Sequence, residues 1–170
     1  MKIMHFVAAL LLVVGATACD QVDLKTAFEI TELSSGYHDA GVTAVGDNKL
    51  VPSISFRLKN LTAEPIRSVD MLIIFVGVEF EQSKELDEVL ITAINSDGIA
   101  AEASSEMVVV RSKQGFALQQ QARSELFNHR LFRDVTAKLF LKRGGSIVPF
   151  GEYTIDRRVL LAAPAESTSR

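Results

Sequence analysis

The chain has very few of the residue types that build redox centres, metal sites and many catalytic sites. Its 170 residues include one cysteine, three histidines and no tryptophan. A single cysteine excludes an internal disulfide, so a folded domain must be held together by packing alone. The sequence also has no paired Cys or His motif with metal-ligand spacing, no nucleophile elbow and no phosphate-binding glycine loop. We therefore expect no metal, no cofactor and no enzymatic activity.

An excess of charge of either sign is missing too. The chain has 18 basic and 21 acidic side chains, which gives a formal net charge of -3, and the basic residues do not cluster. Nucleic-acid-binding proteins need a basic patch or stripe. The composition therefore predicts no nucleic-acid partner.

The first 19 residues, MKIMHFVAALLLVVGATAC, have the layout of an export signal. Lys2 provides a basic start, and the apolar run over residues 6–14 is too short to cross a bilayer as a stable helix. The small residues Ala16, Thr17 and Ala18 then lead directly into Cys19.

This ending resembles the lipobox of bacterial lipoproteins, although that family prefers Leu where this chain has Ala16. The resemblance implies that residues 1–18 are a lipoprotein signal peptide. It also implies that Cys19 carries a thioether-linked diacylglyceride and a further acyl chain such as palmitate. Each buried methylene of such chains contributes about 0.8 kcal/mol to membrane binding. The alternative is an ordinary signal peptide cleaved after Ala18, which leaves a free or buried thiol.

Asp20 follows the predicted lipidation site directly. In enterobacterial lipoproteins, the resemblance implies that Asp at this place retains the protein in the inner membrane, facing the periplasm. The outer membrane is the alternative. We expect residues 19–25 to form an acylated tether, residues 26–161 to form one domain, and residues 162–170 to form a flexible tail.

The most strongly patterned stretch is Val51–Val78. Apolar residues at 54, 56 and 58 alternate with polar ones, and a second alternation follows the turn residues Asn60–Pro65. Alternation with period two is typical of strands that have one buried and one solvated face. We expect these two strands to pair with each other.

The rest of the chain gives weaker signals of the same kind. We expect further strands near residues 27–33, 89–94, 107–110, 135–142 and 147–160, with tight turns at Asp97-Gly98 and Gly144-Gly145. Residues 34–48, including Tyr37 and His38, read as a loop with one short extended piece, and the charged run 79–88 reads as a loop or helical turn. Leu118, Ala122, Leu126 and Phe127 predict a short amphipathic helix over 117–129.

These elements predict an all-β fold, an immunoglobulin-like antiparallel β-sandwich of about seven strands with one short helix. The segments ISFRLKNLTAEPIRSVDMLIIF and AKLFLKRGGSIVPFGEYTI resemble small immunoglobulin-like domains of bacterial envelope proteins. That resemblance implies a fold and no particular activity.

The second central strand carries apolar residues on both faces. Leu72, Ile74 and Val76 lie on the face opposite the predicted core, and an antiparallel sheet normally leaves such a face polar. We expect the stripe formed by Leu118, Leu126 and Phe127 to cover them. The alternative cover is another protein, a second copy or a lipid.

A polar cluster at His129, Arg130, Arg133 and Asp134 is the other candidate site. These residues read more simply as a helix end, where basic side chains meet exposed carbonyls, than as a pocket for an acidic ligand. We therefore expect a non-enzymatic lipoprotein that binds or scaffolds envelope proteins. The alternative function is a carrier or sensor of a small apolar ligand such as a lipid, held between helix and sheet.

Overall fold

The computed structural model describes residues 22–79, 82–119 and 123–160, so the predicted signal peptide, Cys19, Asp20 and the tail at 162–170 lie outside it. Its helical elements are α1 (Leu24–Ala27) and the 3-10 helix η1 (Arg123–Asn128). Its strands are β1 (Phe28–Val42), β2 (Asp47–Asn60), β3 (Val69–Glu79), β4 (Gln82–Ile94), β5 (Val108–Arg111), β6 (Phe116–Gln119), β7 (Val135–Arg143), β8 (Ser146–Thr154) and β9 (Val159–Leu160).

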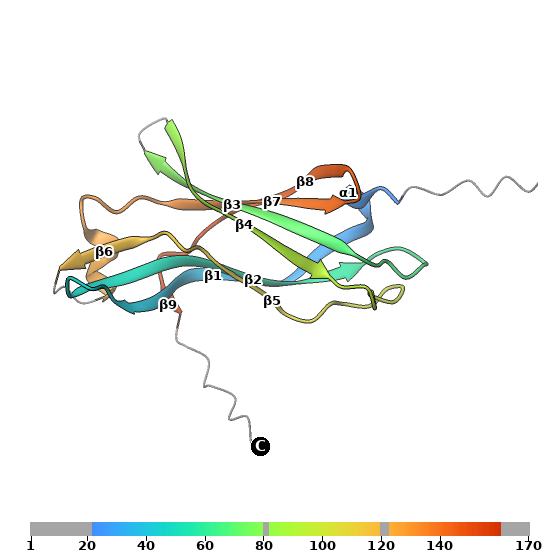
Figure 1. Ribbon diagram of the computed structural model, residues 1–170, viewed down its shortest axis with the longest axis horizontal. Coiled ribbons are helices and arrows are strands. Elements are labelled where there is room, and N and C mark those ends of the chain that lie inside the picture. The colour runs from blue at the N-terminus through green and yellow to red at the C-terminus, as the bar shows by residue number, and fades with distance from the viewer. Residues whose placement is uncertain (1–21, 80–81, 120–122, 161–170) are drawn as a thin grey trace, which may run out of the picture.

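The strands form two sheets that pack face to face, one above the other in Figure 1. One sheet has the order β5-β2-β1-β9, and β6 continues the β5 edge along β2. The other has the order β4-β3-β7-β8. All pairings are antiparallel except that of β9 with β1. With β5 and β6 counted as two pieces of one edge and the two-residue β9 left aside, the two sheets hold seven main strands in the arrangement of an immunoglobulin-like sandwich. The predicted fold class is confirmed.

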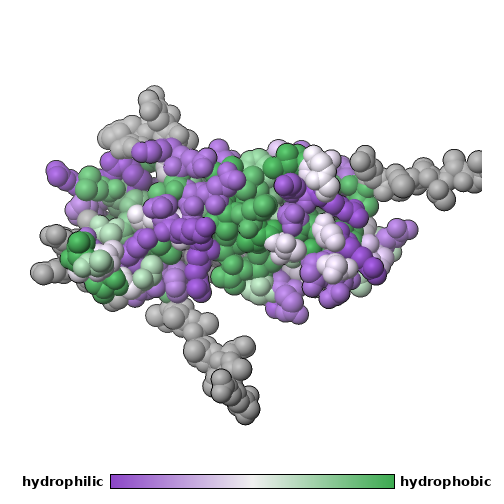
Figure 2. Space-filling model, viewed as in Figure 1, coloured by the Kyte–Doolittle hydropathy of each residue, from purple (hydrophilic) through white to green (hydrophobic). Residues whose placement is uncertain are grey.

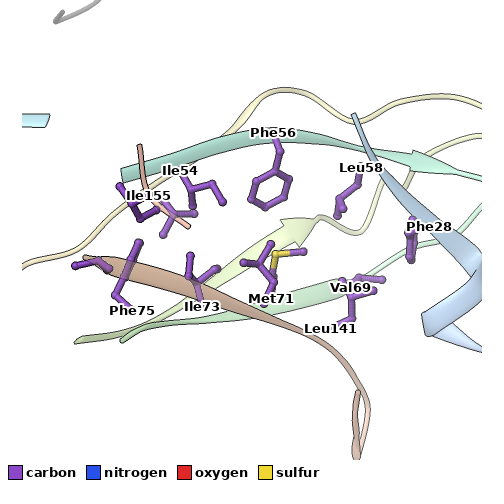
Figure 3. Packing of buried hydrophobic residues seen from close by; sticks show 14 of the residues in the cluster. Phe28, Ile54, Phe56, Leu58, Val69, Met71, Ile73, Phe75, Leu141 and Ile155 are labelled. Carbon is purple, nitrogen blue, oxygen red and sulfur yellow. The ribbon is translucent and has the colours of Figure 1, made fainter. Parts of the chain in front are cut away.

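The core lies between the sheets, and the alternation in the sequence places it correctly. Ile54, Phe56 and Leu58 of β2 are fully buried, as are Val69, Met71, Ile73 and Phe75 of β3. Figure 3 shows the two rows pointing toward each other, with Leu141 of β7 and Ile155 beside them. Val135, Ala137, Leu139 and Leu141 fill the same layer from β7.

The expectation that the two central strands pair with each other is wrong. β2 and β3 belong to different sheets and face each other across the core. Both strands have a wholly apolar inner face, and face-to-face packing at about 10 Å buries both faces at once. Residues 61–68 carry the chain from one sheet to the other and include Ser68, whose φ of 55° turns the chain sharply.

Two predicted loops are strands. Residues 34–42 belong to β1, which runs opposite β2 as far as the pairing of Val42 with Asn48, and Tyr37 in this segment is fully buried. The charged run 79–88 belongs largely to the β3-β4 hairpin, which projects at the upper left of Figure 1. Its described charged residues remain largely solvated. A charged strand is stable here because only its backbone needs a partner.

The helix predicted over 117–129 is wrong in its first part. Residues 116–119 form β6, which pairs with residues 47–50 at the start of β2, and the helical part that the structure describes is limited to η1. Pairing with β2 satisfies the backbone hydrogen bonds of these residues, whereas a short helix is only marginally stable by itself.

The tight turns predicted at residues 97–98 and 144–145 are present, and the folded part begins before residue 26, where we expected its start. Asn95 accepts hydrogen bonds from the backbone N–H groups of Asp97 (3.0 Å) and Gly98 (3.2 Å), and Gly98 has a φ of 83°. Gly144, with a φ of 57°, begins the tight turn between β7 and β8. Leu24, expected in the tether, is buried with Ala27 in the core, so the folded part begins before residue 26.

Candidate binding face

The outer face of the β4-β3-β7-β8 sheet carries a row of apolar side chains across all four strands. Leu72 of β3 lies opposite Leu90 of β4 on one side and opposite Phe140 of β7 on the other, and Phe140 lies opposite Pro149 of β8. Residues directly opposite in an antiparallel ladder lie on the same face of the sheet. These four residues, which we call the outer stripe, therefore span three interstrand spacings, or about 14 Å.

The outer stripe is accessible to solvent. Leu90 is 55% exposed, Pro149 is exposed, and Leu72 and Phe140 are half-buried. Ile147, which lies opposite Lys142 in the next row, is 52% exposed and extends the apolar surface at the β8 edge. An apolar row of this kind on the free face of an antiparallel sheet is unusual, because that face is normally polar.

Charged rows flank the outer stripe on both sides. On one side Asp70 accepts a hydrogen bond from the Thr92 hydroxyl (3.1 Å) and lies opposite Lys142. On the other side Lys138 and Glu152 form an ion pair (3.9 Å). Apolar surface bordered by charges is the arrangement found in the centre and rim of protein interfaces.

The three residues predicted for this face have different surroundings. Leu72 and Ile74 are half-buried on the outer face, as expected, whereas Val76 is only 7% exposed and offers little surface to a partner. The sequence interpretation missed Leu90, Phe140 and Pro149. Phe140 stands between Lys138 and Lys142 at an outward position of an otherwise clear alternation, which was a usable signal for Phe140 alone.

The predicted stripe of Leu118, Leu126 and Phe127 does not form a cover for this face. Leu118 lies in β6, opposite Asn48 in the other sheet. Leu126 is part of the core cluster, and the Phe127 ring lies 5.3 Å from the ring of Tyr37 and 5.3 Å from that of Phe132. These segments instead join an aromatic cluster with Phe116.

The polar residues predicted at 129–134 make mainly local contacts, and one of them also pairs with a residue that is distant in the chain. His129 Nδ1 accepts a hydrogen bond from the Leu131 backbone N–H (3.2 Å). The Arg133 guanidinium donates to the carbonyls of Arg130 (2.6 Å) and Phe132 (2.9 Å). These contacts end the segment after η1 and agree with the simpler interpretation of a helix end.

Asp134 forms the strongest ion pair of this region with Arg157, which the sequence interpretation missed because the two are distant in the chain. Arg157 donates two hydrogen bonds to the carboxylate, at 2.8 and 2.9 Å, and its guanidinium lies 5.4 Å from the centre of the Phe132 ring. The hydrogen bond from Arg157 holds the pKa of Asp134 below its usual value. Burial is the main reason that the pKa of the neighbouring Tyr37 hydroxyl is raised. The pair stabilises the contact between the β7 and β9 ends.

A small cavity lies beside the aromatic cluster. It has a volume of about 170 Å³ and is lined by Phe116, Leu126, His129, Phe132 and their neighbours. Pockets for drug-sized ligands are larger, at about 300–1,000 Å³. The cavity is too small for a lipid chain of ordinary length.

Within residues 22–79, 82–119 and 123–160, no three His, Cys, Asp or Glu side chains converge as a metal site would require. In the same part of the chain, no helix is both long and apolar enough to span a membrane.

Comparisons with known proteins give no family. No protein-family model matches the chain, and no curated protein matches its sequence. Among solved structures, the Northeast Structural Genomics Consortium target SoR45 is similar with a TM-score of 0.45 and 10% identity, over 86% of this chain and 99% of that chain. The ligand binding region of Serine-glutamate repeat protein A of Enterococcus faecium gives a TM-score of 0.28 and 11% identity, over 72% of this chain and 90% of that chain. A beta-glucosidase from Listeria innocua gives a TM-score of 0.30 and 14% identity, over 78% of this chain and 16% of that chain.

Proposed function

We propose that this protein is a lipoprotein of the bacterial cell envelope, anchored through Cys19 and facing the periplasm, that binds another envelope protein without catalysing a reaction. The observation that carries the proposal is the outer stripe, an exposed apolar row on a sheet face that no described element covers. Solvent-exposed apolar patches rimmed by polar residues often mark contact sites with other proteins.

The size of the outer stripe limits how the partner binds. Full burial of one Leu or Phe side chain contributes about 1.5–3 kcal/mol, and association costs at least about 4 kcal/mol. Covering four side chains, two of which are already half-buried, therefore contributes little net binding free energy by itself. A specific interface buries about 800 Å² on each partner, so the contact must extend over the flanking charged rows as well. The Lys138–Glu152 pair and Asp70 then lie at its rim.

A photocrosslinking experiment in cells tests the binding face. A benzophenone amino acid replaces Phe140 in the full-length protein, and the matched control places the same probe at Leu33, an exposed apolar residue of β1 in the other sheet. We expect a discrete heavier adduct from position 140 and none from position 33, with mass spectrometry naming the partner. Equal adducts from both positions, or none from position 140, would contradict the proposal.

The anchor has its own test. We expect the full-length protein to fractionate with the inner membrane, as Asp20 predicts, and the Cys19→Ser variant to lose the acyl mass and the membrane association. A Cys19→Ser variant that still fractionates with membranes would contradict lipid anchoring through this residue. Recovery of the unchanged protein in the outer membrane would contradict only the sorting role of Asp20.

A further inference from the structure

The cavity beside the aromatic cluster has an almost entirely apolar wall. Its volume is about 170 Å³, and Phe116, Leu126, Leu131 and Phe132 supply most of its lining. Protein interiors are close-packed and contain few voids larger than a water molecule. An apolar cavity of about 150 Å³ lined by Leu, Ile and Phe stays dry and takes up benzene. A void of this size and lining therefore suits one small ring.

The wall of the cavity is held in place from behind. The ring centres of Phe116 and Phe132 lie 4.8 Å apart, and the ring of Tyr37 lies 6.2 Å from the first and 5.4 Å from the second. Tyr37 is fully buried, and Leu126 belongs to the core cluster. Because these wall residues are packed against the core, the cavity is preformed, as ligand sites usually are.

The cavity lies at one end of the sandwich and is accessible from solvent. It lies between β6 and the segment that follows η1, at the left of Figure 1. Leu131 in its wall is 59% exposed and Ala117 is also exposed, so the wall reaches the surface. Figure 2 shows apolar surface at this end, separated by hydrophilic residues from the apolar area in the middle of the molecule. A small molecule can therefore enter without separation of the two sheets.

His129 is the one polar side chain among the described residues of the wall. Its Nδ1 accepts a hydrogen bond from the backbone N–H of Leu131 (3.2 Å), so this nitrogen carries no proton and the ring proton lies on Nε2. His129 therefore has one N–H left to donate. A ligand that carries an oxygen can accept this hydrogen bond, whereas a pure hydrocarbon cannot.

We propose that the cavity is a binding site for a small molecule with a single aromatic ring that carries one oxygen, as phenol does. Aromatic rings favour edge-to-face and offset contacts with other rings, and Phe116 and Phe132 offer these. A small apolar ligand between helix and sheet was the alternative function expected from the sequence, and the volume of the cavity favours a ring over a lipid chain. The inference does not rest on the proposed envelope partner, because the outer stripe lies on the other sheet.

Methyl NMR of the full-length protein tests the site. Phenol is titrated into the protein in detergent micelles, and its free concentration is measured in the aqueous phase. The reporters are the methyl groups of Leu126 in the wall and those of Leu139, which is fully buried on β7 and does not line the cavity. We expect saturable shifts of the Leu126 signals, with half-saturation at roughly 1 mM or below, and no shifts of the Leu139 signals.

Toluene, which has the shape of phenol without its oxygen, tests the hydrogen bond from His129. We expect His129→Leu to change the ratio of the two dissociation constants against phenol by roughly fivefold, because one net hydrogen bond is lost. The matched control is His38→Leu. His38 is the other histidine of the described chain and lies in β1, outside the wall of the cavity, so this variant should leave the ratio unchanged.

Two results would overturn the proposal as a whole, namely the absence of a saturable shift at Leu126 and equal shifts at Leu126 and Leu139. A ratio that His129→Leu leaves unchanged would overturn the role of the ligand oxygen. The titration of the unchanged chain needs no variant, so a variant that fails to fold does not affect the test of the site. The Phe140 crosslink to another protein does not depend on phenol binding, so the two proposals fail separately.

Discussion

Replacement of Asn60 by Ala is expected to be among the most destabilising polar substitutions in this protein. Asn60 ends β2 and is fully buried. Its amide donates to the carbonyls of Glu64 (2.8 Å) and Ala100 (3.0 Å), and its Oδ1 accepts from the N–H (2.9 Å) and hydroxyl (2.8 Å) of Thr62. One side chain thus joins the segment that crosses between the sheets to the loop that follows β4.

The size of the effect follows from those four contacts. Each net hydrogen bond contributes about 0.5–1.5 kcal/mol, and buried groups left without partners cost more than exposed ones. The Thr62 hydroxyl also donates to the Glu64 carbonyl (2.8 Å), so part of the network survives the substitution. We expect Asn60→Ala to lower the free energy of unfolding by about 3 kcal/mol. Asn60→Asp keeps the acceptor but places an oxygen against two carbonyls, and we expect at least the same loss.

Urea unfolding of the full chain, followed by far-ultraviolet circular dichroism, measures these changes. Asn95→Ala is the matched control, because Asn95 makes the same kind of turn contacts in an exposed position, and we expect it to cost less than about 1 kcal/mol. The reasoning would be refuted if Asn60→Ala were no worse than Asn95→Ala, or if Asn60→Asp matched the unchanged protein.

Three further predictions test the packing and the ion pairs. Burial alone would raise the pKa of Asp87, but hydrogen bonds from the backbone N–H of Lys113 and the hydroxyl of Ser112 lower it below its usual value. Asp87→Asn should therefore destabilise the protein by roughly 1 kcal/mol at neutral pH, and the difference should disappear in urea titrations as the pH falls through that lowered pKa. Asp134→Asn should cause a small loss of thermal stability at low salt, and addition of salt should remove the difference from the unchanged protein, because the pair with Arg157 is half exposed. A loss that salt does not alter would contradict this. Ile73→Ala should cost about 2–5 kcal/mol in urea unfolding and Leu90→Ala less than about 1, and equal losses would contradict the assignment of core and outer face.

The sequence by itself determined which face of most strands is buried. Alternation identified Ile54 and Phe56 on β2 and Leu139 on β7 as core residues, because side chains on a strand point to opposite faces in turn. Turn chemistry was local as well. Asn60 bonds its own backbone two residues on, and Gly98 adopts a positive φ, and both effects depend on residues that are adjacent in the chain.

Only the tertiary structure decided which strands are neighbours. Alternation of apolar and polar residues indicates that a strand has an inner face. It does not indicate whether the next strand pairs beside it or packs opposite it, so the prediction that β2 pairs with β3 was wrong. Residues 117–119 belonged to a helical pattern, yet the free edge of β2 offered their backbone a better set of hydrogen-bond partners. For the same reason Arg157 could not be matched to Asp134 from the sequence, since the pair forms only when the β7 and β9 ends meet. The outer stripe is likewise a product of register, because Leu90, Leu72, Phe140 and Pro149 become one row only when the ladders of four strands align.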